Sequence, residues 1–216
     1  MNNLNKSLLI RAIIAFVGCV FIAIGISLSG TVKMGMDPFT ALWVAVSNIL
    51  GIGLGNVMLV VNLIIFAVIM VIDRSKFGLG TFINWVFTGY MIQYFTDYFL
   101  SIGLGEGDYN LLIRVVLTFI SVTILLFGAA LYMSAGIGMA PLDAIAPVIE
   151  EKTKLTYVQG RMLHEMLCLV LAFFLGGPVG LMTIYMGFFA GPMIAMFRAK
   201  LAEPIVKRLT GETIYQ

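Results

Sequence analysis

Charged residues are scarce in this sequence: they make up 11% of its 216 residues, whereas hydrophobic residues make up 61%. A soluble domain of this size carries roughly a quarter charged residues, because its surface must be solvated by water. The mean hydropathy of +1.04 is correspondingly high. The net charge of +2 also excludes the broad basic surface by which proteins bind nucleic acids. The composition therefore predicts an integral protein of the lipid bilayer, with no nucleic-acid partner.

Reactive side chains are also few. The chain has two cysteines, Cys19 and Cys168, and one histidine, His164. Both cysteines lie inside apolar runs, where cysteine acts as a small hydrophobic residue rather than as half of a disulfide or a metal ligand. There is no HExxH, GxSxG, P-loop or CxxC motif. The sequence thus predicts no metal, no cofactor and no classical enzyme activity; a membrane-embedded enzyme would have to use His164 and Glu165 almost alone.

An internal duplication is the main feature that the sequence does contain. Residues 8–41 align with residues 111–144 without a gap, and eleven of these thirty-four positions are identical. The match resumes farther along with a one-residue slip, where Gly78 aligns with Gly180. The sequence therefore consists of two copies of one unit. The matches hardest to attribute to apolar composition are Arg11 with Arg114, Gly25 with Gly128, Gly35 with Gly138 and Pro38 with Pro141.

Six stretches are long and apolar enough, or nearly so, to cross a hydrocarbon core of about 30 Å, which takes roughly 20 helical residues. Two further helical stretches, Pro38–Leu50 and Pro141–Lys152, are too short, since at about 1.5 Å per residue each reaches only about 20 Å. Each begins with proline, which suits the first position of a helix. We predict an all-α membrane protein of six transmembrane helices and two short helices. The six spans are Leu8–Ser29, Asn56–Ile72, Gly80–Leu100, Leu111–Met133, Gly160–Leu175 and Leu181–Phe197.

With six spans, nearly all basic residues fall on one side of the membrane. Cytoplasmic loops are enriched in Lys and Arg, so both termini are predicted to be cytoplasmic. The acidic loop with Glu106 and Asp108 then lies outside, and Lys33 is the one basic residue in an outer loop. An eight-span arrangement would reverse the sides of Arg74 and of the acidic loop, and is rejected. The basic residues assigned to the inner side are Lys6, Arg11, Arg74, Lys76, Lys152, Lys154, Arg161, Arg198, Lys200, Lys207 and Arg208.

Each copy then contains three spans, an odd number, so the second copy must enter the membrane from the opposite side. The sequence therefore predicts an inverted-topology 3+3 repeat, in which residues 1–104 and residues 105–216 are related by a pseudo-two-fold axis in the membrane plane. Inverted repeats are a common plan of secondary transporters, whose sites lie near the midplane between short or broken helices.

Two motifs occur once in each copy. Gly-Met-x-Pro opens the short helix at Gly35 and at Gly138, and Gly-Leu-x-Thr enters the third span at Gly78 and at Gly180. The pattern resembles the YczE/YyaS/YitT family of bacterial membrane proteins, and the resemblance covers nearly the whole chain. It implies a multi-pass protein of the plasma membrane in Bacillota-like bacteria, and it transfers no activity or functional residue.

The placement of the two short helices has two interpretations. They would either enter the membrane from opposite faces or lie flat at its surface. Pro38–Leu50 is apolar nearly all round, which favours re-entry, whereas Pro141–Lys152 is more amphipathic, which favours the interface. Asp37 precedes the first short helix and is predicted to cap it. Asp37 and Trp43 are candidates for a substrate or ion pathway.

Glu165 and His164 are the most informative polar residues, because ionisable groups in a transmembrane helix are functional candidates by default. Arg161, Glu165, Cys168 and Ala172 share one helix face by their spacing. An Arg161–Glu165 pair would neutralise both charges in a purely structural role. The other interpretation is that a buried Glu165 carries a proton. A lone histidine is more often a satisfied packing residue than a ligand.

Polar residues of the second and third spans complete the pathway candidates. Asn62 is the equivalent of Glu165 in the first copy. Asn84 and Thr88 lie on one stripe of the third span, with Gln93 farther along. Such groups either join helices through hydrogen bonds or line a polar cavity, which nearby aromatic residues such as Trp43 would support.

Three functions are compatible with these features. The leading hypothesis is a secondary transporter for a small organic solute, amphipathic or weakly charged. The alternative is a non-transporting membrane subunit: a substrate-binding component of a larger transporter, or a partner of a membrane enzyme. A channel would need more polar positions than one chain offers. The sequence leaves open a homodimer or a partner subunit.

Our first prediction concerns the topology. With Cys19 and Cys168 replaced by alanine, Asp108→Cys should react with a membrane-impermeant thiol reagent only from outside the cell, and Lys76→Cys only from the cytoplasmic side. Reaction of Asp108→Cys from the cytoplasm would contradict both the six-span topology and the inversion of the second copy.

Overall fold

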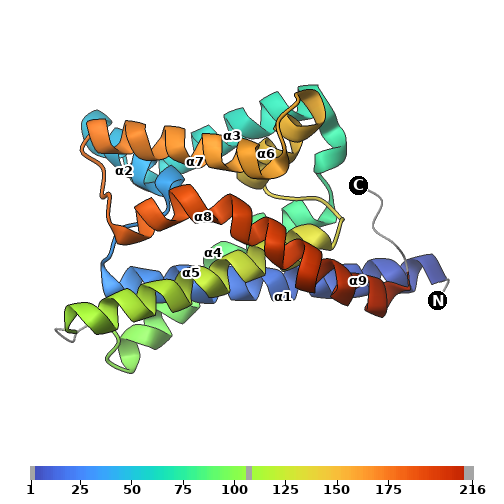
Figure 1. The fold of residues 1–216 in the computed structure, drawn as a ribbon, viewed down its shortest axis with the longest axis horizontal. Helices are drawn as coiled ribbons and strands as arrows, with labels where there is room; N and C mark the ends of the chain where they lie inside the picture. The colour runs from blue at the N-terminus through green and yellow to red at the C-terminus, as the bar shows by residue number, and fades with distance from the viewer. Residues whose placement is uncertain (1–2, 106–108, 212–216) are drawn as a thin grey trace.

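The structure, a computed structural model, describes residues 3–105 and 109–211. Glu106 and Asp108 of the acidic loop lie outside these residues. All regular structure in the described residues is helical, which confirms the predicted all-α class (Figure 1). The elements are α1 (Asn3–Val32), α2 (Pro38–Leu50), α3 (Leu54–Asp73), the 3-10 turn η1 (Arg74–Lys76), α4 (Leu79–Ser101), α5 (Leu111–Ser134), α6 (Pro141–Lys152), α7 (Tyr157–Phe174), α8 (Leu181–Phe197), the π-helical turn η2 (Arg198–Ala202) and α9 (Glu203–Thr210).

The two short helices have the bounds that the sequence predicts. α2 begins at Pro38, and the preceding Asp37 side chain accepts a hydrogen bond from the N–H of Thr40 at 2.9 Å. Asp37 is therefore the N-cap, as expected, since it satisfies one of the free N–H groups of the first turn. α6 begins at Pro141 without a side-chain cap, because Ala140 stands in the capping position.

Four helical stretches among the described residues are long and apolar enough to cross a membrane. They coincide with α1, α3, α5 and the continuous stretch from α8 to α9. Polar residues interrupt the apolar sequence of the other two long helices, Gln93 in α4 and Arg161 in α7. The six-span count therefore stays a prediction.

α1 and α5, the first helices of the two copies, lie side by side and run antiparallel (Figure 1). Arg11 near the start of α1 donates to the carbonyl of Ala135 just beyond the end of α5, at 3.0 Å. Arg114 near the start of α5 donates to the carbonyl of Val32 at the end of α1, at 2.9 Å. The two arginines are 103 residues apart, and so are the two residues whose carbonyls they contact; this is the shift of the duplication. The same contact is thus made twice, in opposite directions.

Glycines allow the two helices to approach closely. A Cβ added to Gly25 of α1 would lie 2.7 Å from the carbonyl oxygen of Ser121. A Cβ added to Gly128 of α5 would lie 2.7 Å from the carbonyl oxygen of Gly18. These two contacts are again equivalent under the 103-residue shift. Small residues at such a crossing let backbones touch, which gives apolar helices in lipid their dispersion contacts.

A second reciprocal contact joins the loop before each short helix to the last long helix of the other copy. The N–H of Met182 in α8 donates to the carbonyl of Met34 at 3.0 Å, and the N–H of Gly80 in α4 donates to the carbonyl of Ile137 at 2.7 Å. The glycine after each carbonyl, Gly35 or Gly138, has a φ near +100° that other residues rarely adopt. The glycine of the Gly-Met-x-Pro motif therefore forms a turn that lets the preceding carbonyl bond to the other copy.

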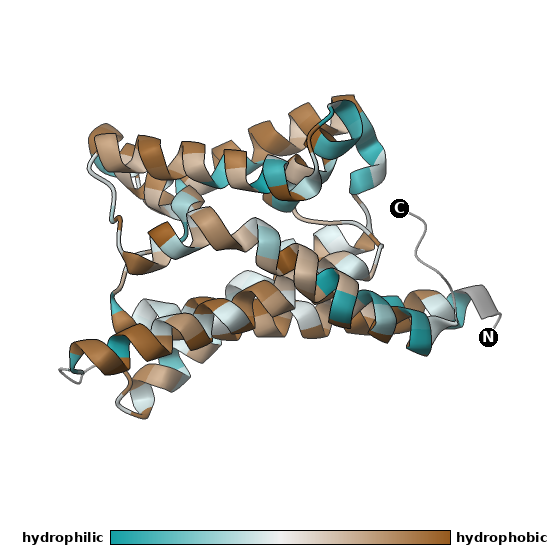
Figure 2. Ribbon diagram, in the orientation of Figure 1, coloured by the Kyte–Doolittle hydropathy of each residue, from teal (hydrophilic) through white to brown (hydrophobic). Residues whose placement is uncertain are grey.

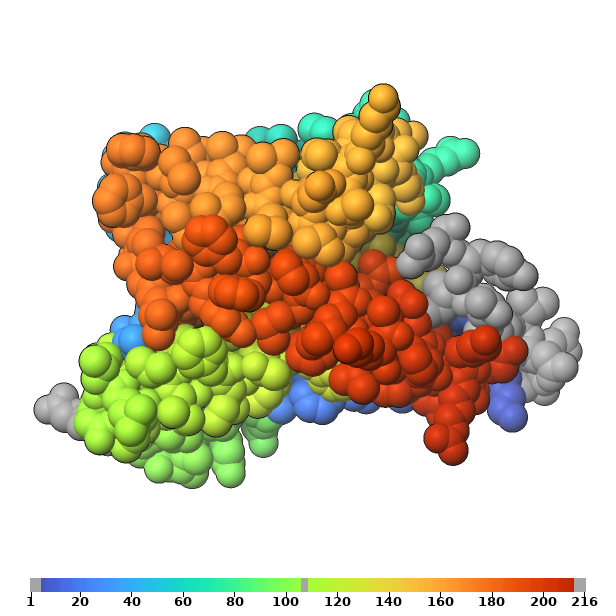
Figure 3. All heavy atoms as spheres, viewed as in Figure 1, coloured from blue at the N-terminus to red at the C-terminus, as the bar shows by residue number. Residues whose placement is uncertain are grey.

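The helices form three layers (Figure 1). α1, α4 and α5 form one, α2, α3, α6 and α7 form the opposite one, and α8 crosses between them. α5, α8 and α7 make a continuous surface on the face shown in Figure 3. Hydrophilic residues gather at the end of the molecule that holds α9 and the first turns of α1 (Figure 2).

Our second prediction tests the crossing of α1 and α5. Gly25→Ala and Gly128→Ala should each lower the midpoint of thermal unfolding in detergent, since overpacking a tight contact costs about 1–3 kcal/mol. Gly30→Ala is the matched control on α1, because a Cβ there would meet nothing within 4 Å. It should leave the midpoint unchanged or raise it slightly. Equal effects of Gly25→Ala and Gly30→Ala would show that the crossing is not close-packed.

Candidate functional site

A cavity of about 270 Å³ lies between the two outer layers, beside α8. Its wall is largely apolar, with a few polar and charged groups, which is the usual make-up of a site for a small organic molecule. The lining residues are Ile22 and Ile26 of α1; Asp37, Phe39 and Thr40 at the start of α2; Met58 and Asn62 of α3; Asn84, Trp85 and Thr88 of α4; Leu125, Leu126 and Ala129 of α5; Ala140, Leu142 and Asp143 at the start of α6; Arg161 and Glu165 of α7; and Met186 and Ile194 of α8.

Most of this lining comes in equivalent positions of the two copies. Seven pairs are separated by 103 residues, and an eighth, Asn84 with Met186, by 102. The two copies therefore face each other across the cavity with the same positions, although the side chains at those positions differ. The seven pairs are Ile22 with Leu125, Ile26 with Ala129, Asp37 with Ala140, Phe39 with Leu142, Thr40 with Asp143, Met58 with Arg161 and Asn62 with Glu165.

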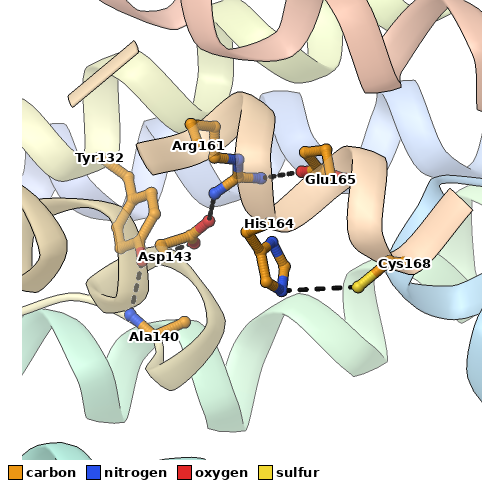
Figure 4. A network of polar contacts seen from close by, with 7 residues as sticks. All are labelled: Tyr132, Ala140, Asp143, Arg161, His164, Glu165 and Cys168. Carbon is orange, nitrogen blue, oxygen red and sulfur yellow. Dashed lines mark hydrogen bonds and ion pairs between the residues drawn. The ribbon is translucent and has the colours of Figure 1, made fainter. Parts of the chain in front are cut away.

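Arg161 of α7 lies between two carboxyl groups (Figure 4). Its Nη1 is 3.0 Å from Oδ1 of Asp143 on α6, and its Nη2 is 2.9 Å from Oε1 of Glu165, one turn along α7. The side chains of Arg161, Asp143 and Glu165 are only 7%, 14% and 2% exposed. Buried charges need such partners, because transfer out of water costs several kcal/mol per ion. One cation therefore holds two anions and ties α6 to α7.

Tyr132 of α5 extends this network to the start of α6 (Figure 4). Its hydroxyl donates to Oδ2 of Asp143 at 2.9 Å and accepts a hydrogen bond from the N–H of Ala140. The tyrosine thus satisfies the N–H of Ala140, the residue just before α6, whose methyl side chain caps none of the first-turn N–H groups. The network fixes the carboxylate of Asp143 beside the cavity.

Three polar atoms of the cavity-lining residues have no hydrogen-bond partner among residues 3–105 and 109–211. They are Oε2 of Glu165, Oγ1 of Thr88 and Nε of Arg161. A buried polar atom without a partner costs free energy that a bound ligand or water would recover. The two oxygens and the N–H group are therefore available to a polar group inside the cavity.

The first turns of both short helices lie at this cavity. Asp37 and Thr40 line it from the start of α2, and Ala140 and Asp143 from the start of α6. The opposite end of α6, at Lys152, is exposed. A helix N-terminus carries roughly half a positive charge, so two such ends contribute to the electrostatics of the site.

The structure gathers five of the eight candidate residues around the cavity: Asp37, Asn62, Asn84, Thr88 and Glu165. It places the other three elsewhere. His164 lies near the Sγ of Cys168 and the ring of Phe39. Trp43 lines a separate apolar pocket between α2 and α3, and Gln93 is exposed on α4 and donates to Asp97.

Residue spacing correctly indicated the buried face of α7, which holds Arg161, Glu165, Cys168 and Ala172. It also indicated the Arg161–Glu165 pair. Sequence reasoning missed the contribution of Asp143 and Tyr132, since these lie on other helices. The only available signal was that Asp143 lies two residues after the second Gly-Met-x-Pro motif, in the first turn of the short helix. No group of three His, Cys, Asp or Glu residues in the described part of the chain is arranged to hold a metal ion.

Comparisons with known proteins agree with the motifs. Residues 9–199 match the model of a family described as "Family of unknown function (DUF6198)". The chain is 28% identical over 193 residues to the uncharacterized protein YyaS of Bacillus subtilis (strain 168), covering 89% of this chain and 92% of the relative. It is 25% identical over 189 residues to the uncharacterized membrane protein YczE of the same organism, covering 87% and 85%. No solved structure matches the chain significantly.

The resemblance to YczE and YyaS that the motifs predict is thereby confirmed. Together with the apolar helices, it identifies the chain as an all-helical membrane protein. Neither relative's name states a substrate or an activity.

Our third prediction concerns the charges around Arg161. Arg161→Gln leaves Asp143 and Glu165 buried without their cation, and should destabilise the protein by about 3–5 kcal/mol. Glu165→Gln keeps the ion pair between Arg161 and Asp143 and should lower the free energy of unfolding much less. Thermal unfolding in detergent measures both. Glu151→Gln, which removes only an exposed partner of Lys76, is the control and should cost about 1 kcal/mol or less. A larger loss with Glu165→Gln than with Arg161→Gln would contradict this arrangement.

Proposed function

The chain belongs to the DUF6198 family, and we propose that it is a secondary transporter for a small organic solute in the bacterial plasma membrane. In this proposal the cavity is the binding site, and it lies near the midplane between two inverted repeats, residues 1–104 and residues 105–216. The protein has six transmembrane helices, with both termini in the cytoplasm.

The paired lining of the cavity is the observation that carries the proposal. Eight pairs of equivalent positions surround one space. In transporters built from inverted repeats, the site lies where the two repeats meet, so that rocking of one repeat against the other exposes it alternately to each side. A cavity that lay within one copy would have no such relation to the duplication.

The antiparallel contact of α1 and α5 supports the inversion. Equivalent helices that run in opposite directions, with reciprocal contacts at Arg11 and Arg114, require a two-fold axis perpendicular to both helices. With α1 and α5 crossing the membrane, that axis lies in the membrane plane. The hydrophilic end of the molecule, which holds α9, is then the cytoplasmic end (Figure 2).

The short helices support a site inside the membrane. Their first turns, at Asp37 and at Asp143, meet the same cavity. They are therefore re-entrant in this proposal, α2 from the outer face and α6 from the cytoplasmic face. Backbone that is not part of a spanning helix is tolerated at this depth where it lines a cavity.

Our fourth prediction tests alternating access without requiring the solute. With Cys19 and Cys168 replaced by alanine, Thr88→Cys places a thiol on the cavity wall. A membrane-impermeant thiol reagent should modify it both in right-side-out and in inside-out vesicles. Ser121→Cys is the control: this residue is 0% exposed and lies at the contact between α1 and α5, so it should react from neither side.

Modification of Thr88→Cys from one side only would contradict transport by this chain. It would favour instead a non-transporting membrane subunit that presents its cavity to one compartment, and co-purification of a partner would then identify the complex.

A further inference from the structure

The charges at the cavity do not balance. Arg161 is the one cationic side chain in the described lining, which also holds three carboxyl groups, those of Asp37, Asp143 and Glu165. The two helix N-termini contribute roughly half a positive charge each. With all carboxyl groups ionised, the sum is an excess of about one negative charge at the cavity. An anionic solute would be repelled here, and a cationic one attracted.

Two of the carboxyl groups leave an acceptor free for such a cation. Glu165 is 2% exposed, and its Oε2 has no hydrogen-bond partner among the described residues, because Arg161 contacts only Oε1. Asp37 accepts the N–H of Thr40 through Oδ1, which leaves Oδ2 directed to no described donor. Phe39 and Trp85 contribute aromatic rings to the lining of the same cavity, and aromatic faces attract organic cations.

The cavity wall differs in exposure between the two copies. Met186 and Ile194 of α8 are 3% and 0% exposed, whereas Trp85 of α4 is 45% exposed. Asn62 of α3 and Asn84 of α4 are also partly exposed. These exposures indicate that the cavity is least enclosed at α3 and α4.

The sequence difference between the copies explains this opening. α7 packs directly against α8: a Cβ added to Gly187 of α8 would lie 3.1 Å from the nearest side-chain atom of α7. The equivalent of Gly187 in the first copy is Trp85, 102 residues earlier. α3 and α4 show no comparable backbone approach, and the ring of Trp85 contacts Phe66 of α3 across the space, with centroids 5.4 Å apart. Where α7 and α8 of the second copy are in close contact, α3 and α4 of the first are joined mainly through aromatic side chains. This less closed side of the cavity is the side opening.

We propose that the cavity binds an amphipathic organic cation, with its charged group between Asp37 and Glu165 and its apolar part against Phe39 and Trp85. Because the side opening lies between two membrane helices, such a molecule reaches the site from the bilayer. The proposal rests on the cavity being the binding site of the proposed transporter, and it adds the class of the solute.

The test compares three probes of similar shape and different charge. They are benzyltrimethylammonium, which is cationic, neopentylbenzene, its neutral isostere, and phenylmethanesulfonate, an anion. Each is added to the purified full chain in detergent, and binding is measured as the rise in the midpoint of thermal unfolding with probe concentration, since a ligand of the native state stabilises it by mass action. We expect binding of the cation at least tenfold tighter than binding of either other probe.

Variants then locate the site. Asp37→Asn removes one charge while keeping an N-cap residue, so the protein should fold and bind benzyltrimethylammonium at least tenfold more weakly. Asp97→Asn is the matched control, because Asp97 is an exposed carboxylate of α4 that accepts from Gln93, away from the cavity. It should bind the cation as the native chain does.

Three results would overturn the proposal: equal binding of the neutral probe, tighter binding of the anion, or equal loss of cation binding in Asp37→Asn and Asp97→Asn. The proposal would also be overturned if the cation showed no binding at concentrations up to about 10 mM, which corresponds to a binding free energy of about −3 kcal/mol. None of these results bears on alternating access, which thiol labelling measures independently, so failure of the solute class and failure of transport are distinguishable.

Discussion

The close antiparallel contact of α1 and α5 is the constraint on which the rest of the structure depends. Lipid tails are as apolar as leucine, so helices in a bilayer associate through dispersion contacts and hydrogen bonds rather than through the hydrophobic effect. Gly25 and Gly128 bring the two backbones into contact, and Arg11 and Arg114 bond the carbonyl groups at either end. Because both contacts occur twice, they position one copy relative to the other, and the cavity forms between them.

Duplication gives this cavity a symmetric outline, and later divergence gives it asymmetric chemistry. Met58 and Asn62 in the first copy correspond to Arg161 and Glu165 in the second. A membrane interior tolerates few charges, because each must be paired as it leaves water. The second copy holds the paired charges and the close contact of α7 with α8 at Gly187, whereas the first has Trp85 at that position and no comparable contact of α3 with α4. One copy supplies the charge network, and in our proposal the other supplies the opening.

The paired charges of the candidate site were predictable from the sequence only where the partners share a helix. Arg161 and Glu165 are one turn apart on α7, so their pairing follows from helical periodicity. The bond between Arg161 and Asp143 joins two helices, and no spacing rule relates their side chains. Gln93 shows the converse: it is polar and close to Thr88 along α4, but it lies on the exposed side, because a helix turns residues five positions apart onto different faces.

The sequence by itself determined the membrane class, the duplication and the bounds of the short helices, because composition, repeat spacing and proline position act locally along the chain. It also placed Asp37 as a cap, which depends on only four consecutive residues. Only the tertiary structure decided which polar residues meet. Tyr132, Asp143 and Glu165 come from three helices, and the distances between helices depend on the packing of small residues such as Gly25 and Gly187, which no local pattern encodes.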